Sequence, residues 1–215
     1  MRTVELFAGS CSFTKVAKSK GFETFTTDII NSNDIDYSVD IMLFDAADVP
    51  FIPDVIWASP DCATWSKAAG NLHYESRSMK PKTEKAKQAI LHIEKMLNVI
   101  DYFLKLNPAL LYYIENPVGK LINYLKRGSL FEPVFNIPRV VTIDQCQYGR
   151  EYMKPTHIFT NDLSWIPRER CKGGKSCNHK KNIKNAGSGK KNQLASNRYY
   201  KRAEVASELF YEILK

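Results

Sequence analysis

Long apolar runs are missing from this sequence. No stretch approaches the roughly 18 consecutive apolar residues of a membrane-spanning helix. The amino terminus also lacks the basic region and apolar core of a secretory signal, because a strand-like pattern that carries Glu5 begins almost at once. No internal repeat is present. These absences argue against a membrane or secreted protein and predict a soluble protein of the cytoplasm.

Cysteine is also scarce. The sequence has five cysteines, an odd and scattered set, whereas secreted proteins with a disulfide framework use an even number at regular spacings. We therefore expect reduced thiols, at least one of which is available for chemistry. The cysteines stand at positions 11, 62, 146, 171 and 177.

Three potential metal ligands gather toward the carboxyl terminus. Cys171, Cys177 and His179 stand close together, and Cys146 or His157 is a candidate fourth ligand of a zinc ion. The spacing matches no standard zinc motif, so we favour the interpretation that these residues hold no metal.

Positive charge is concentrated in one segment. At 215 residues and 44% apolar content, the chain is long enough for a substantial core, and we expect one domain over residues 1–215. Between Pro167 and Arg202 there are 12 Lys or Arg and one acid, Glu169, whereas the remainder has 19 basic and 22 acidic residues. This pattern favours a short basic insertion over 161–200 that contacts nucleic-acid phosphates, although a solvated loop is the alternative.

Strand-like apolar runs alternate with helical patterns, which predicts an α/β fold with a doubly wound, mostly parallel sheet. The spacing after Thr83 predicts a helix of about 20 residues that ends at Asn107-Pro108. A polar stretch at 63–82 without periodicity predicts a mobile loop that can close over a substrate. Further strands are expected near 2–7, 23–27, 35–39, 54–58, 111–114, 139–143 and 156–160, and further helices near 12–20, from about 117, and at 203–214, with a loop or short helix near 43–47.

Two of the predicted strands end in chemically useful residues. The run Asp54-Val-Ile-Trp-Ala-Ser-Pro-Asp leads to Cys62, and Leu111-Tyr-Tyr-Ile114 leads to Glu115. Open α/β sheets carry their reactive groups at the carboxyl ends of the strands. We therefore expect a thiol and a carboxyl group to face one crevice.

Six short motifs follow one another along the chain. In this order they resemble those of the cytosine-5 DNA methyltransferases, most closely the short, phage-type members. The resemblance implies the seven-stranded fold of S-adenosylmethionine-dependent methyltransferases, with S-adenosylmethionine as the cofactor and the terminal helix completing its pocket. The motifs are Glu5-Leu-Phe-Ala-Gly-Ser10, Thr26-Thr-Asp28-Ile29, Asp40-Ile41, Ser59-Pro-Asp-Cys62, Glu115-Asn-Pro117, and Tyr148-Gly149 with Lys154-Pro-Thr156.

The resemblance also implies a set of cofactor-binding residues. The turn made by Phe7, Ala8, Gly9 and Ser10 is expected to lie against the methionine part, where a side chain at Gly9 would hold the ligand away from the backbone. Asp28 is expected to bind the ribose, and Asp40 with Ile41 the adenine. Ile29 and Pro60 are also expected to contact the cofactor. An acid that caps a local turn is the alternative for each aspartate.

The same resemblance implies the catalytic residues. Cys62 is expected to be the nucleophile that attacks carbon 6 of cytosine, and Glu115 to bind the base at N3. Lys154 replaces the first arginine of a Gln-x-Arg-x-Arg motif in the family, and Arg150 is expected to supplement its charge. A buried cysteine in the core and a glutamate in a salt bridge are the alternatives for the first two.

The implied enzyme is a monomeric DNA (cytosine-5)-methyltransferase that acts on a base flipped out of double-stranded DNA. Restriction-modification and protection of a phage genome in the host cytoplasm are both compatible with it. Two alternatives stay open: a tRNA cytosine-5 methyltransferase, and a catalytically silent nucleic-acid-binding protein. Asp61 favours the second alternative, because a carboxylate beside Cys62 raises the pKa of the thiol.

Overall fold

A seven-stranded sheet forms the centre of the molecule. The computed structural model describes residues 1–76, 78–126, 137–173 and 205–215. Within them the strand order is β3-β2-β1-β4-β5-β7-β6, which confirms the predicted α/β methyltransferase-type sheet. The strands are β1 (Arg2–Leu6), β2 (Glu23–Asp28), β3 (Tyr37–Ser38), β4 (Val55–Ala58), β5 (Leu111–Pro117), β6 (Arg139–Asp144) and β7 (Pro155–Thr160).

Strand direction changes at one side of this sheet. The pairs β3–β2, β2–β1, β1–β4 and β4–β5 are parallel, as predicted for most of the sheet. In contrast, β7 pairs antiparallel with both β5 and β6. The residue before β7 therefore lies at the sheet edge where the parallel strands end.

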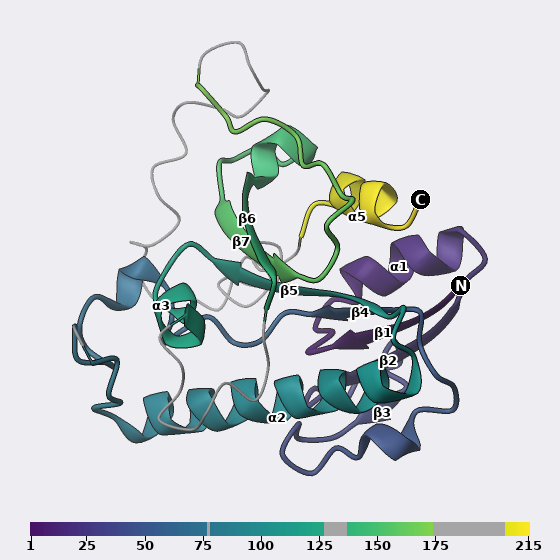
Figure 1. Cartoon of the computed structure of the whole chain (residues 1–215), viewed down its shortest axis with the longest axis horizontal. Coiled ribbons are helices and arrows are strands. Elements are labelled where there is room, and N and C mark those ends of the chain that lie inside the picture. Colours follow the sequence, from purple (N-terminus) through teal and green to yellow (C-terminus); the bar gives the residue numbers. More distant parts are fainter. Residues whose placement is uncertain (77, 127–136, 174–204) are drawn as a thin grey trace.

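One face of the sheet is covered by the long helix α2 (Glu84–Leu106), which crosses it as Figure 1 shows. Thr83 caps the helix, since its hydroxyl accepts a hydrogen bond from Ala86 N at 3.2 Å. The helix ends before Asn107-Pro108, as predicted, because the residue before a proline disfavours helical geometry. Its buried face includes Ile93, Met96, Ile100 and Phe103.

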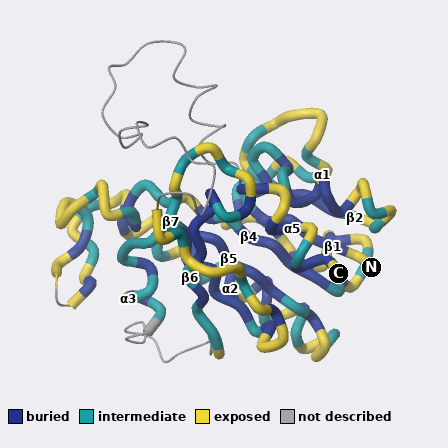
Figure 2. Tube along the Cα trace, turned by 90° about the horizontal axis from the view of Figure 1, so that it is seen from above, coloured by how far each residue is buried: buried dark blue, intermediate teal, exposed yellow. Residues whose placement is uncertain are grey.

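The opposite face carries α1 (Ser12–Ser19) and the terminal helix α5 (Ser207–Ile213), which lie side by side. Phe13 of α1 and Phe210 of α5 pack on Trp57 of β4, with ring centroids 5.8 and 4.8 Å from the indole. The terminal helix thus packs on the first helix. Figure 1 shows the sheet between these two helical layers, and Figure 2, seen from above, shows strands β4 and β5 as mostly buried.

The segment 63–82, predicted as an irregular polar loop, packs two aromatic side chains into the fold, whereas its predicted mobility stays a prediction. It contains the 3-10 helix η2 (Lys67–Ala69), and Trp65 and Tyr74 are both buried, stacked with centroids 4.6 Å apart. The two aromatic side chains follow no periodicity that a sequence pattern detects. Their burial anchors the chain that follows Cys62.

Two other boundaries also differ from expectation. Strand β5 continues to Pro117, and the next helix, α3 (Leu121–Lys126), begins four residues later than predicted. The remaining short helices are η1 (Ala46–Asp48), as expected near 43–47, and η3 (Gln145–Tyr148).

Several predictions fall outside the described residues. Most of the basic segment, together with Cys177 and His179, lies in 174–204, so the basic insertion and the single-domain organisation stay predictions. Among residues that the structure does describe, no group of three His, Cys, Asp or Glu side chains is arranged to hold a metal. Within the same residues, no helix combines the length and the apolar character needed to cross a membrane.

Candidate active site

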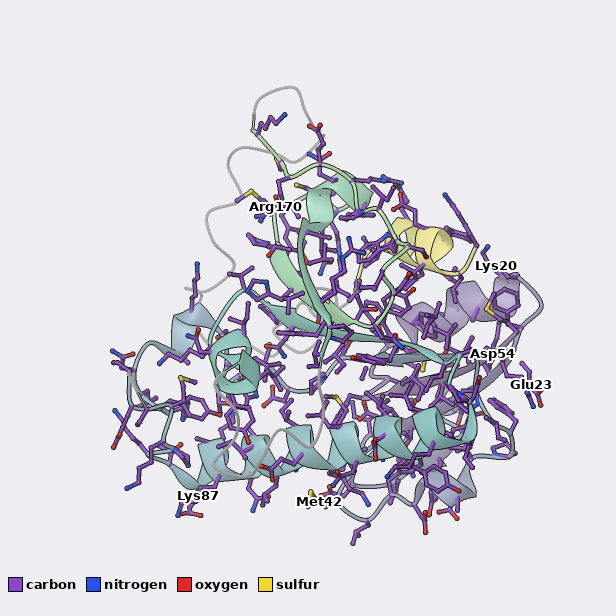
Figure 3. The ribbon with its side chains drawn as sticks, viewed as in Figure 1. Lys20, Glu23, Met42, Asp54, Lys87 and Arg170 are labelled. Atoms are coloured by element: carbon purple, nitrogen blue, oxygen red, sulfur yellow. The ribbon has the colours of Figure 1, made fainter. Side chains whose placement is uncertain are left out.

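A cavity of about 440 Å³ opens at the carboxyl ends of the parallel strands. Figure 3 labels Glu23 and Asp54, which mark the opposite edge, where β2 and β4 begin. Almost every site residue predicted from the sequence lines this cavity. They are Phe7, Ala8, Gly9, Ser10, Asp28, Ile29, Asp40, Ile41, Pro60, Cys62, Glu115 and Lys154.

In the turn after β1, backbone atoms form part of the cavity wall. Phe7, Gly9 and Cys11 all have left-handed backbone geometry, with φ of 56°, 50° and 55°. A Cβ added at Gly9 would meet no atom within 4 Å, so it would point into open space beside the cavity. Gly9 N donates a hydrogen bond to Asp28 Oδ2 at 2.9 Å, which ties this turn to the end of β2.

Asp28 and Asp40 also stabilise their own turns. Asp28 Oδ1 accepts a hydrogen bond from Ile30 N, and Asp40 Oδ1 accepts one from Met42 N, both at 2.9 Å. The capping role considered from the sequence is therefore present at both positions. It coexists with a place in the cavity wall, because each carboxylate oxygen has more than one lone pair. Buried Ile41 adds an apolar surface next to these acids.

Away from the turns at Gly9, Asp28 and Asp40, the cavity brings together the three residues Cys62, Glu115 and Lys154. Cys62 follows β4, Glu115 lies in β5, and Lys154 immediately precedes β7. Lys154 Nζ is 3.3 Å from Glu115 Oε1, and only 18% and 6% of the two side chains are exposed. The salt bridge considered for Glu115 therefore exists, and its partner is itself one of the predicted catalytic residues.

The pKa of the Cys62 thiol is raised above its ordinary value. Burial is the main cause, and the negative charges of Glu115 and Asp61 add to it, whereas the ammonium group of Lys154 acts in the opposite direction. The effect anticipated from Asp61 is therefore present. Ionisation of the thiol depends on the balance between two carboxylates and one lysine.

Arg150 is placed differently from its prediction. It is absent from the described residues that line the cavity, and its guanidinium lies over the ring of Tyr152, 5.4 Å from the centroid. Thr156, at the position of the second arginine in the family motif, is buried and accepts a hydrogen bond from Gln145 Nε2 at 3.1 Å. Among the described residues, Lys154 is a cation that acts on the Cys62 thiol.

Glu5 and His92 line the cavity but were not among the site residues predicted from the sequence. Glu5 is buried under the turn after β1, where it accepts hydrogen bonds from Phe13 N and Thr14 N at 3.3 and 2.8 Å. Burial raises its pKa to about 7 despite these bonds. His92 reaches the cavity from α2. The acid between Val4 and Leu6 of the first strand was a usable signal for Glu5, whereas a half-buried histidine on a long helix gave none.

A relative of this chain is found in a virus. The chain is 30% identical over 185 residues to a protein of Frog virus 3 (isolate Goorha) described as "Probable DNA (cytosine-5)-methyltransferase", covering 82% of this chain and 78% of that one. No protein-family model matches.

Solved structures of similar fold include a Dnmt2 methyltransferase from S. pombe, with a TM-score of 0.41, 16% identity and coverage of 74% of this chain and 48% of that one. Another is a DNMT2 mutant from Spodoptera frugiperda, with a TM-score of 0.46, 16% identity and coverage of 80% and 53%. This chain thus spans about half the length of these two proteins. The viral relative, matched over most of both sequences, shows that the chain belongs to the cytosine-5 DNA methyltransferase family.

Proposed function

We propose that this protein transfers a methyl group from S-adenosylmethionine to carbon 5 of cytosine in double-stranded DNA, through a covalent adduct with Cys62. The observation that carries the proposal is the convergence of Cys62, Glu115 and Lys154 on one cavity with the turn at Gly9 and Asp28. The viral relative is described as a probable DNA enzyme, which supports DNA as the substrate.

The cavity fits the proposed cofactor. Asp28 and Asp40 offer carboxylate oxygens for the ribose hydroxyls and the adenine amine, and Ile41 offers an apolar surface for the ring. The open side of Gly9 leaves room for the methionine part against the backbone. When bound, S-adenosylmethionine supplies a methyl group activated by a positively charged sulfur. Cavity residues at these positions would hold it beside Cys62.

The side chains account for the remaining chemistry. As Cys62 bonds to carbon 6 of the cytosine as the thiolate, Glu115 takes up the thiol proton and passes it to N3, so that carbon 5 gains the electron density needed to accept the methyl group. After methyl transfer, water takes the proton from carbon 5, the electrons of the bond between sulfur and carbon 6 return to sulfur, and Cys62 leaves as the thiolate while N3 gives its proton back to Glu115. A thiol cannot reach carbon 6 in a stacked duplex, so the base must leave the helix.

The direct test incubates the purified protein with S-adenosylmethionine and mixed-sequence duplex DNA, followed by detection of 5-methylcytosine by mass spectrometry. Cys62→Ser is the matched control, because it keeps the size of the side chain and removes the nucleophile. We expect product with the unmodified protein alone. Transfer RNA, tested in parallel, identifies an RNA enzyme if it is methylated and DNA is not. Cofactor binding without any methylation would contradict the proposal and indicate a silent binding protein.

A further inference from the structure

The turn between β5 and α3, residues 116–120, contacts every segment that carries a proposed catalytic residue. Asn116 Nδ2 donates to Pro60 O at 3.2 Å, just before Cys62. Val118 N donates to Pro155 O at 3.1 Å, just after Lys154. Lys120 N donates to Trp65 O at 2.7 Å, after Cys62. The turn itself continues the strand that carries Glu115.

Gly119 is the point of closest approach in this turn. It forms a β-bridge with Ser66. A Cβ added at Gly119 would lie 2.1 Å from Trp65 O and 3.1 Å from Ser66 Cα. Both are backbone atoms, so no side-chain rotation can relieve the clash. The φ of Gly119 is outside the left-handed region, and this position therefore needs glycine for lack of space.

The neighbours of Gly119 transmit any displacement to Cys62. Trp65 N and Ser66 N both donate to Cys62 O, at 3.1 and 2.9 Å, so residues 62–66 form one hydrogen-bonded turn. Trp65 is held on its other side, since its ring packs on Tyr74 and Tyr124 with centroids 4.6 and 5.5 Å away. A side chain at position 119 would thus push against a turn that contains the nucleophile.

We propose that Gly119 is a positioning residue, which sets the separation of Cys62 from Glu115 by allowing direct backbone contact between their two chain segments. The proposal deepens the proposed function and rests on it for the identity of the reaction. A misplacement of reacting groups by about 1 Å costs roughly 100-fold in rate. We expect the loss mainly in turnover, because the close contacts of Gly119 are with Trp65 and Ser66 of the turn that follows Cys62, whereas the segment meets the cofactor-binding residues only through the Asn116 hydrogen bond to Pro60.

The test compares Gly119→Ala with the unmodified protein. We expect kcat to fall about 100-fold while the Kd for S-adenosylmethionine stays within about twofold. We also expect faster alkylation of Cys62 by iodoacetamide at neutral pH, followed by mass spectrometry of the peptide that carries Cys62. The thiol loses burial when its turn is displaced, and burial is the main cause of its raised pKa. Alkylation needs no nucleic acid, so it tests the positioning even if the protein methylates neither DNA nor RNA.

Gly21→Ala is the matched control. Gly21 has a φ of 74° and no atom within 4 Å of an added Cβ, so alanine there strains the backbone at the end of α1 without touching the cavity. We expect it to lower stability and leave kcat and the alkylation rate unchanged. A folded Gly119→Ala protein whose kcat and whose rate of Cys62 alkylation are both within about twofold of the unmodified protein would overturn the proposal.

Hydrogen exchange keeps the proposal testable if Gly119→Ala does not fold. In the unmodified protein, the amide of Lys120 should be strongly protected, because its hydrogen bond to Trp65 O closes the contact next to Gly119. Exchange of that amide at the rate of an open chain would show that the two segments are not held together and would also overturn the proposal.

Discussion

The reactivity of Cys62 depends on its burial and on its charged neighbours. Glu115 and Asp61 raise the pKa of the thiol, in addition to the larger effect of burial, and Lys154 lowers it. Only the thiolate attacks carbon. Substitutions that change a single charge, with little change in side-chain shape, should therefore alter the rate at which the Cys62 thiol is alkylated in a predictable direction.

Asp61→Asn should increase the reactivity of Cys62. The change removes a negative charge, yet the Oδ1 atom that accepts a hydrogen bond from Ala63 N at 3.0 Å is retained. The pKa of the thiol should fall, and alkylation of Cys62 at pH 7 should become roughly two- to fivefold faster, as expected for a partly screened charge nearby. The pH dependence of iodoacetamide labelling measures this effect.

Lys154→Gln provides the opposite change and serves as its control. Removal of the cation should raise the pKa of Cys62 and slow its alkylation at the same pH, whereas Lys154→Arg should preserve the rate. Equal rates for Asp61→Asn and Lys154→Gln would show that these charges do not govern the thiol.

Glu5 should give stability a distinct pH dependence. Its pKa is raised from 4.5 to about 7 in the folded protein by burial. Between these two values the unfolded chain releases a proton that the folded chain still holds, so the free energy of unfolding falls as pH rises from about 4.5 to about 7 and is then level. Over this pH range, Glu5 lowers the free energy of unfolding by up to about 3 kcal/mol.

Urea unfolding of the unmodified protein and of Glu5→Gln, at pH 5 and pH 7.5, isolates this contribution. We expect the difference between the two pH values to shrink in the variant, because glutamine does not titrate. An identical pH dependence in both proteins would mean that Glu5 keeps an ordinary pKa.

At the scale of elements, the aromatic contact between α1, β4 and α5 holds the terminal helix on the sheet. Phe210 is buried and its ring lies 5.4 Å from Phe13 and 4.8 Å from Trp57. Val205, just before this helix, lines the cavity. The packing of α5 therefore stabilises the fold and also fixes one wall of the site.

Phe210→Ala should cost about 3–5 kcal/mol of stability, because it leaves a cavity between three elements. It should also weaken binding of S-adenosylmethionine through the wall at Val205. Urea denaturation and calorimetric titration measure the two effects. The neighbouring Tyr211→Ala is the control, since Tyr211 is 47% exposed and its loss should cost less than about 1 kcal/mol. Similar costs for both variants would contradict this account of the packing.

At the scale of the whole molecule, charge is divided between two parts of the sequence. The surplus between Pro167 and Arg202 is +11, from 12 basic residues and one acid, whereas the remainder sums to −3, from 19 basic and 22 acidic residues. A chain with this distribution should bind nucleic acid through the basic segment, with an affinity that falls steeply as salt is added.

Replacement of Lys180, Lys181 and Lys190 by alanine should reduce the slope of log affinity against log salt by roughly 0.9 for each phosphate that the variant no longer neutralises. Fluorescence anisotropy with a duplex at several salt concentrations measures the slope. Replacement of Lys85, Lys87 and Lys105 on α2 removes the same charge elsewhere and should leave the slope nearly unchanged. Equal effects of the two triple variants would place the binding surface outside the basic segment.

Much of the architecture follows from local sequence patterns. The helix at Glu84–Leu106 was predictable from its apolar spacing, its Thr83 cap and the proline at 108. The positions of Cys62 and Glu115 at the cavity also followed from the sequence, because parallel strands bring their carboxyl ends to one sheet edge. The caps, apolar spacings and prolines that indicate a helix or strand lie within or next to that element in the sequence.

The tertiary structure alone decided which distant residues meet. The antiparallel direction of β7 brings Lys154 within 3.3 Å of Glu115, although the two residues are 39 positions apart. The burial of Trp65 and the close approach at Gly119 likewise depend on chain segments that no local pattern connects. The sequence by itself determined the elements and their reactive ends, whereas packing between distant segments determined the charges and spacing around the thiol, because electrostatic and steric effects depend on distance in space.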